Sequence, residues 1–129
     1  MPKGDFSFCF MFSNRNLENL KYFSDLETLV LDKNGLVGLG NCPVIPTVQT
    51  LWCNNNLIDD LPSFMDQVVE KFPKLQYLSI MRNPACPGLT DIKAPDLEAL
   101  RLYRMYILFR FPQLQVLDWT EVCDAVRCI

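Results

Sequence analysis

Three stretches of the chain repeat one spacing of apolar residues, and no other feature limits the possible folds as strongly. The stretches begin at Leu26, Val48 and Leu75, and each reads apolar-x-x-apolar-x-apolar-x-x-Asn. Inside each stretch the central apolar residues alternate, as in a strand that buries one face. Ahead of each stretch apolar residues recur every third position, a spacing typical of a 3₁₀ or short helical turn. Each repeat therefore predicts one helical turn, one short strand and a sharp turn at the asparagine.

The intervals between the repeats predict a solenoid that contains one longer helix. The first two repeats are 22 residues apart, and the third begins 27 residues after the second. The longer interval contains residues 62–72, whose apolar positions have helical spacing. We expect Phe64, Val68 and Phe72 to pack into the core, and a groove for a partner helix is the alternative interpretation.

The recurring asparagines Asn34, Asn56 and Asn83 are predicted to be structural. The chain must leave each strand sharply, and a buried amide can donate to and accept from the backbone groups that such a turn frees. Stacked repeats would place the three amides one above another, as an asparagine ladder. The sequence gives no catalytic side chain to accompany them, so their expected role is to hold the turns.

The two ends of the chain carry degenerate versions of the repeat. Residues 1–16 contain alternating phenylalanines, which predict a strand and an N-terminal cap or degenerate first repeat. Residues 17–89 are the repeats. Residues 90–129 predict a C-terminal cap, with a helix over 96–111 and the strand spacing again at 114–119. The prediction is a single α/β domain over 1–129: a right-handed solenoid with a short curved parallel sheet on its concave face and 3₁₀ or helical turns on its convex face.

Composition argues against several classes of function. The sequence has no histidine, C-x-x-C pair, glycine-rich nucleotide motif or catalytic serine motif, so we expect no enzyme activity, no cofactor and no metal. The net charge is −3 and basic residues are scattered, so direct binding of nucleic acid is not expected. Residues 6–12 are apolar but too short to insert across a membrane. The expected partner is another protein, and the expected state is a monomer.

The cysteines and paired aspartates are given structural interpretations. Six cysteines occur without a recognisable secretion signal, which favours reduced thiols in the cytoplasm. Cys53 stands where neighbouring repeats have aliphatic residues, so we expect a small buried side chain. Asp59 and Asp60 are interpreted as a solvated turn, with a cation site as the alternative. Cys123 and Cys128 lack a second pair of zinc ligands, and a redox-regulated or metal-binding protein would need them accessible and reactive.

Recognition is predicted on the strand face that lies opposite the core. If Leu29 and Leu31 point inward, their neighbours point onto the concave face, because side chains alternate along a strand. An exposed Trp52 near Tyr77 and Met81 has the composition of a binding hot spot. The alternative is that the cap or a loop covers Trp52. The predicted partner-binding residues are Thr28, Val30, Asp32, Thr50, Trp52, Asn54, Tyr77, Ser79 and Met81, with Val116, Asp118 and Thr120 facing outward in the cap.

The repeats, together with Tyr-Arg-Met-Tyr-Ile-Leu-Phe-Arg-Phe-Pro-Gln-Leu-Gln-Val-Leu-Asp at residues 103–118, resemble leucine-rich repeat proteins that end in an LRR cap. That group includes a phosphatase-1 regulatory subunit, the spliceosomal A-prime protein and ciliary proteins. Residues 19–34, Phe-Pro-Lys-Leu-Gln-Tyr-Leu-Ser at 72–79 and Asn-Pro-Ala-Cys-Pro at 83–87 are similar to a branch of the family associated with melanocyte differentiation. The resemblance implies an intracellular, non-enzymatic role in pigment-cell differentiation.

Two functions follow as hypotheses. The first is a protein-interaction module, a scaffold that binds a partner protein on its concave face. The alternative is a structural subunit of a ciliary or spliceosomal assembly, held through its cap and convex face. The alternative predicts that changes at Arg101, Arg104 or Arg110 disrupt assembly while Trp52→Ala does not. The first hypothesis predicts that Trp52→Ala lowers the affinity for the partner and leaves folding nearly intact.

Overall fold

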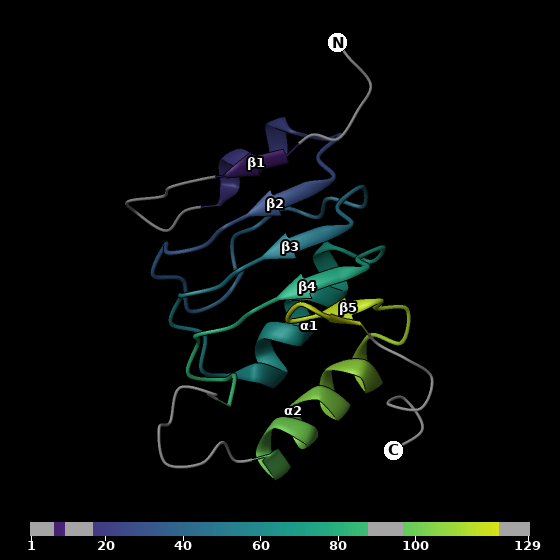
Figure 1. Ribbon diagram of the computed structural model, residues 1–129. Coiled ribbons are helices and arrows are strands. Elements are labelled where there is room, and N and C mark those ends of the chain that lie inside the picture. Colours follow the sequence, from purple (N-terminus) through teal and green to yellow (C-terminus); the bar gives the residue numbers. More distant parts are fainter. Residues whose placement is uncertain (1–6, 10–16, 88–96, 122–129) are drawn as a thin grey trace.

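The fold is organised around one curved sheet whose strands follow one another in chain order (Figure 1). The computed structural model describes residues 7–9, 17–87 and 97–121. Strands β1 to β5 run parallel, and β6 pairs antiparallel with β5. The strands are β1 (Ser7–Cys9), β2 (Thr28–Val30), β3 (Thr50–Trp52), β4 (Tyr77–Ser79), β5 (Val116–Leu117) and β6 (Thr120–Glu121).

The register of the sheet confirms the alignment of the repeats. Leu29 pairs with Leu51, Leu51 with Leu78, and Leu78 with Leu117. All four leucines are buried in one continuous core cluster. The strand predicted near the start of the chain is confirmed at residues 7–9, where it extends the sheet beside β2. The rest of the predicted N-terminal cap lies outside the described residues.

The helices are η1 (Glu18–Tyr22), α1 (Leu61–Lys71) and α2 (Leu97–Arg110). Figure 1 shows α1 behind the sheet and α2 beside its β5 end. The 3₁₀ helix η1 confirms the helical turn predicted before β2. Before β3 the prediction is met only by isolated turns: the Cys42 amide donates to Leu39 O at 3.0 Å and the Val48 amide to Ile45 O at 3.2 Å, and residues 31–49 contain no helix. Pro43 and Pro46 explain the difference, since proline has no amide hydrogen and disfavours helical backbone in the residue before it.

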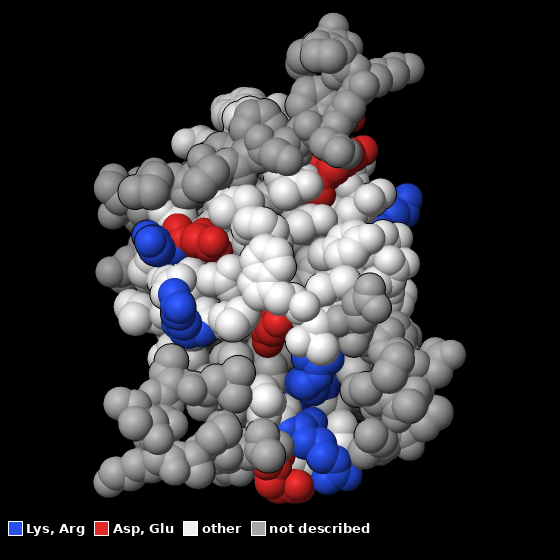
Figure 2. All heavy atoms as spheres, viewed as in Figure 1, with Lys and Arg blue, Asp and Glu red and all other residues white. Residues whose placement is uncertain are grey.

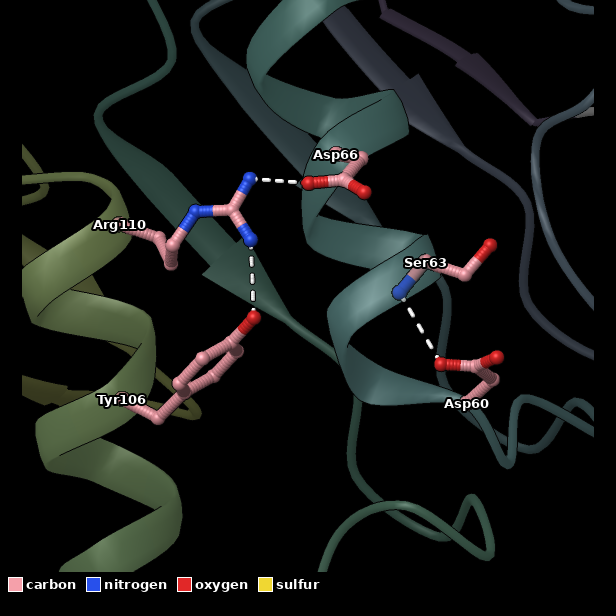
Figure 3. Close-up of polar contacts among 5 residues, drawn as sticks. All are labelled: Asp60, Ser63, Asp66, Tyr106 and Arg110. Carbon is pink, nitrogen blue, oxygen red and sulfur yellow. Dashed lines mark hydrogen bonds and ion pairs between the residues drawn. The ribbon is translucent and has the colours of Figure 1, made fainter.

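The long helix predicted between the second and third repeats is confirmed as α1. Asp60 is its N-cap: the carboxylate Oδ1 accepts a hydrogen bond from the Ser63 amide at 3.1 Å (Figure 3). Asp59 and Asp60 are exposed, as predicted, but Asp60 caps a helix, a role that the sequence interpretation as a solvated turn did not include. Phe64, Val68 and Phe72 are buried, which confirms that this face of the helix packs into the core.

The asparagine ladder joins neighbouring repeats through the ends of their strands. Asn56 Nδ2 donates to the carbonyl oxygens of Leu31 at 3.0 Å and Cys53 at 2.9 Å, one from each of two repeats. Asn83 Nδ2 likewise donates to Cys53 O and Ile80 O, both at 2.9 Å. Asn34, Asn56 and Asn83 are all buried. Polar groups that emerge from the buried ends of the strands are thus hydrogen-bonded inside the protein.

A residue with left-handed backbone precedes each ladder asparagine. These residues are Lys33, Asn55 and Arg82, with φ of 60°, 59° and 58°. The left-handed conformation turns the chain sharply out of the strand so that the next amide points back into the core. Asparagine tolerates this conformation better than most non-glycine residues. The second repeat therefore has the least strained residue at this position.

Candidate functional site

The structure places most of the predicted partner-binding residues on the concave face but buries two of them. Tyr77 is exposed, and six others are half-buried. The half-buried residues are Thr28, Val30, Asp32, Thr50, Trp52 and Met81. Asn54 and Ser79 are 8% and 3% exposed. Their prediction as surface residues is therefore wrong.

The burial of Asn54 has a physical cause in the turn that ends β3, and Ser79 of β4 is buried beside it. Strand alternation stops at residue 52, so it no longer decides where Asn54 points. Asn54 Oδ1 accepts hydrogen bonds from Ser79 Oγ at 2.7 Å and from the Met81 amide at 2.8 Å. Asp32 has a similar role one repeat earlier, where its Oδ1 accepts from the Asn54 amide at 2.8 Å. These polar side chains support the turns.

Trp52 is covered on one side by Trp119, which the sequence reasoning did not place on this face. The two ring centroids are 4.8 Å apart and the ring planes meet at 61°, an edge-to-face contact. Trp119 is itself 60% exposed. The expectation of a freely exposed Trp52 is thus corrected: the structure instead presents a pair of tryptophans.

Trp119 reaches the concave face because the chain reverses there. Alternation from Leu117 would turn Trp119 toward the core, where Leu31, Cys53 and Ile80 lie in the other repeats. Instead Asp118 and Trp119 have φ of 51° and 68° and form the two-residue turn between β5 and β6. Both central residues of a type I′ hairpin turn have positive φ. The available signal was a two-residue gap between possible strands, but it lacked the usual Asn-Gly or Asp-Gly sequence.

The two tryptophans and Tyr77 form the main apolar feature of the concave face, which we call the concave aromatic cluster. They line a shallow hollow of about 260 Å³, together with Thr50, Leu78, Ser79 and Val116. No charged side chain is among these lining residues. Figure 2 shows the same uncharged centre on the face in view, with charged groups toward its borders.

The position of Trp119 is energetically costly for the chain. A left-handed conformation costs a non-glycine residue about 1–2 kcal/mol. Asparagine and aspartate can offset part of this cost with a local hydrogen bond from the side chain, but the large apolar ring of tryptophan does not. The edge-to-face contact with Trp52 offsets part of this cost, because such aromatic pairs contribute about 0.5–1.5 kcal/mol. Strain of this kind is concentrated at functional positions.

Asp118, the other residue of this turn, is half-buried and bonded inward, which corrects its prediction as an outward-facing residue. In the regular repeats the Leu31 amide donates to Trp52 O at 2.7 Å, and the Cys53 amide donates to Ser79 O at 2.8 Å. The equivalent amide of Ile80 donates to Asp118 Oδ1 at 2.8 Å. The carboxylate thus supplies the acceptor that a strand carbonyl supplies elsewhere.

A small group of titratable side chains surrounds the Asp118 carboxylate. Tyr103 OH donates to Oδ2 at 2.6 Å, and Cys86 Sγ lies 3.9 Å from the same oxygen. Burial raises the pKa of all three groups, and for Asp118 the hydrogen bonds from Tyr103 and Ile80 oppose the increase. The half-buried, hydrogen-bonded carboxylate of Asp118 thus links α2 to the β5–β6 turn through Tyr103.

The three arginines of the alternative hypothesis all lie on α2, and each has different contacts. Arg101 forms an ion pair with Glu98 at 3.3 Å, and Arg104 Nη1 donates to Leu117 O at 3.1 Å. Arg110 forms an ion pair with Asp66 of α1, and its Nη1 donates to Tyr106 OH at 2.8 Å (Figure 3). Asp66 is exposed, so this contact lies at the surface.

The cysteines that the structure describes with their side chains are free thiols. Cys42 and Cys53 are buried, as predicted for Cys53, and Cys86 is half-buried. Cys123 and Cys128 lie outside the described residues. Within the described part of the chain, we find no group of three side chains placed to hold a metal ion. Its helices are also too short and too polar to cross a membrane.

These features define a class of protein: a solenoid in which each repeat contributes one parallel strand and one ladder asparagine. Residues 10–128 match the sequence profile of the leucine-rich repeat family. The chain belongs to the leucine-rich repeat family.

Two relatives and one solved structure indicate where the chain stands within that family. It is 38% identical over 115 residues to the human leucine-rich melanocyte differentiation-associated protein, an alignment that covers 89% of this chain and 58% of the relative. It is 30% identical over 120 residues to the U2 small nuclear ribonucleoprotein A′ of Schizosaccharomyces pombe, covering 82% of this chain and 49% of the relative. The chain thus spans about half the length of these relatives.

The structural comparison supports the fold. A chain in the crystal structure of the Drosophila melanogaster SNF/U2A′ complex superimposes with a TM-score of 0.60 at 24% sequence identity. The superposition covers 92% of this chain and 74% of that chain. At this level of sequence identity the similarity shows the fold and gives no information on the binding surface.

Proposed function

We propose that the chain is a non-enzymatic module that binds a partner protein on its concave face through the concave aromatic cluster. The observation that carries the proposal is Trp119, a large aromatic residue held in a strained turn, mostly exposed, against a second tryptophan. A fold selected only for stability would favour glycine or asparagine at that position. Exposed tryptophan and tyrosine side chains bury much area on binding and lose little conformational entropy.

The uncharged lining of the hollow supports a protein partner. Charged residues are depleted from the centres of protein interfaces, where aromatic residues are enriched. Nucleic acid would instead require cationic groups across the face. The human relative's name connects it with melanocyte differentiation. We extend that role to this chain as part of the proposal, together with a cytoplasmic, reducing location and a monomeric state.

The first prediction concerns Trp119→Gly, which removes the side chain and relaxes the turn. The relief of about 1–2 kcal/mol of backbone strain should balance the lost contact with Trp52, so the folded protein should remain as stable as the wild type. Partner capture should fall by about tenfold or more, as expected for a hot-spot aromatic. Quantitative pull-down from cell extract, comparing the wild type with Trp119→Gly and Trp52→Ala, measures the loss.

The matched control is Phe109→Ser on α2. Phe109 is 81% exposed and is not among the residues that line the concave hollow, so its removal deletes an exposed aromatic side chain outside the proposed site. Partners captured through the concave face should be retained by this variant. If Trp119→Gly and Trp52→Ala are folded and still capture every partner that the wild type captures, the concave site is wrong.

A second function, as a structural subunit held through α2, is supported by the exposed apolar residues of that helix. Phe109 and Leu102 are 81% and 55% exposed and lie two turns apart on one side of it. The similarity to the A′ protein of a ribonucleoprotein gives this role a precedent among relatives. It predicts the opposite result in the same experiment: Phe109→Ser would lose partners that Trp119→Gly retains.

A further inference from the structure

A second hollow lies next to the concave aromatic cluster, on the other side of the β5–β6 turn. Its volume is about 680 Å³, within the range of specific binding sites. Asp118 and Thr120 line this hollow, whereas Trp119 between them lines the aromatic one. The turn is therefore a shared wall, and one bound segment can contact both hollows.

The second hollow differs from the first in its charge. Arg82 lines it from the turn after β4, and Arg104 lines it from α2. Arg82 is exposed, and Arg104 is half-buried. Among the described residues that line this hollow, no other is basic. Arg104 uses one donor of its guanidinium group on Leu117 O, which leaves further N–H donors of that five-donor group for a ligand.

Asp118 is the only carboxylate among the described lining residues, and its contacts compensate its charge internally. Its Oδ1 accepts from the Ile80 amide, and its Oδ2 accepts from Tyr103 OH with the Cys86 thiol nearby. Arg104 also stabilises the ionised form of this carboxyl. An incoming group therefore meets two guanidinium groups and a carboxylate whose oxygens are already hydrogen-bonded, which favours a negatively charged ligand.

The remaining lining gives the second hollow an apolar part. Met81, Pro84, Pro87 and Leu100 contribute apolar side chains beside the arginines. A ligand that suits both parts has a carboxylate next to an aliphatic or aromatic group. In a polypeptide, this is an aspartate or glutamate with an apolar neighbour.

We propose that the partner bound by the concave aromatic cluster continues across the β5–β6 turn with an acidic residue that pairs with Arg82 and Arg104. This inference rests on the proposed function, because the aromatic cluster supplies the anchor. Charge complementarity sets the direction in which the bound segment runs. Its uncharged part lies on the concave aromatic cluster, and its acidic part lies in the second hollow, between Arg82 and Arg104.

The experiment begins with a displayed library of random peptides selected on the wild-type chain. We expect the enriched peptides to carry Asp or Glu beside aliphatic or aromatic residues. The strongest peptide is then synthesised with its acidic residue intact and with that residue changed to the neutral amide. Affinity of both peptides is measured for the wild type and for Arg82→Asn, Arg104→Gln and the double variant.

The double variant should bind the acidic peptide about tenfold more weakly, while the neutral peptide should bind wild type and variant alike. Asparagine already occupies the equivalent left-handed position 55 of the preceding repeat, so Arg82→Asn keeps the turn. Lys33→Asn is the matched control, because Lys33 has the same conformation two repeats away and does not line the hollow. It should leave both affinities unchanged.

The outcomes separate this inference from the proposed function. The inference is overturned if the selected peptides need Trp119 for binding but lack acidic residues, or if their affinity is unchanged by the arginine substitutions. In either case the concave site of the proposed function still stands. Peptides that bind without dependence on Trp119 or Trp52 overturn the proposed function as well. A phosphorylated peptide that binds well through the two arginines while its carboxylate counterpart does not would also overturn the choice of ligand.

Discussion

At the scale of single residues, the ladder asparagines Asn56 and Asn83 hold backbone groups of neighbouring repeats. Asn56 shows this most completely. Its Nδ2 donates to Leu31 O and Cys53 O, while its Oδ1 accepts from the amides of Asn34 at 2.9 Å and Leu36 at 3.1 Å. Asn56 is buried and its side chain both donates and accepts hydrogen bonds. An apolar residue of similar size cannot replace it, because each backbone partner would lose its hydrogen bond.

The substitution Asn56→Leu should therefore lower the free energy of unfolding by about 2–4 kcal/mol, because buried backbone groups left unpaired cost about 1–3 kcal/mol each. Urea denaturation followed by tryptophan fluorescence measures the change. The adjacent Asn55→Gly is the control: its left-handed φ of 59° suits glycine, and its effect should stay within about 0.5 kcal/mol. If both variants lose a similar amount of unfolding free energy, the hydrogen bonds of the Asn56 amide do not contribute more to stability than its neighbour does.

The sequence predicts the ladder residues well because a fixed spacing brings the same residue type to the same place in each repeat. Asn54 was not predicted correctly, because strand alternation does not extend beyond β3 into the turn where its hydrogen bonds form. Ser79 lies within β4 and lines the concave hollow, as alternation requires, but it is 3% exposed and donates its hydroxyl to Asn54. Trp119 was missed for a related reason. Its place depends on a reversal of the chain that only the backbone conformation of residues 118 and 119 reveals.

At the scale of elements, α1 and α2 contact each other through apolar residues in the core and one ion pair at the surface. Ile107 of α2 is buried in the same core cluster as Met65 and Val68 of α1, whereas the Arg110–Asp66 pair is solvent-exposed on the Asp66 side (Figure 3). Burial of apolar area is the stronger of the two effects, since exposed ion pairs are screened by water and salt. The long helices were predictable from their spacing, but the hairpin turn was not, because it is short and lacks glycine.

The comparison of Ile107→Ala with Asp66→Asn tests this ranking. Ile107→Ala should lower the free energy of unfolding by about 2–5 kcal/mol, because it removes buried methyl groups and leaves a cavity. Asp66→Asn should leave the urea midpoint unchanged within error and should do so at both low and high salt. A large, salt-dependent loss for Asp66→Asn would mean that the ion pair holds the helices together.

At the scale of the whole molecule, each repeat packs mainly on its neighbours in the chain. The strand order follows the sequence from β1 to β6, so the fold could be predicted once the repeat was found. The binding surface could be predicted only in part. Its face followed from alternation, but the aromatic pair and the two adjoining hollows arise where the regular repeat stops, at β5 and β6.

The repeats also share one core, so their buried thiols make the stability of the whole molecule depend on pH. Burial raises the pKa of the Cys42 thiol from 9.0 to about 12, against an opposing effect of Lys71. Burial likewise raises the pKa of Cys53 well above 9.0. Below pH 9 these thiols are neutral in both the folded and unfolded chain, so the stability is fully present. Above pH 9 the unfolded chain loses the protons while the folded chain keeps them, and stability falls.

We expect each thiol to lower the free energy of unfolding by about 1.4 kcal/mol between pH 8 and pH 10, a decrease that follows from the linkage of proton release to unfolding. Urea denaturation at the two pH values measures the decrease for the wild type and for the double variant Cys42→Ala, Cys53→Val. The variant retains the effects of the tyrosines and lysines and lacks only those of the two thiols. Its decrease should be smaller by about 3 kcal/mol, and an equal decrease in both proteins would mean that the thiols ionise as readily in the folded core as in the unfolded chain.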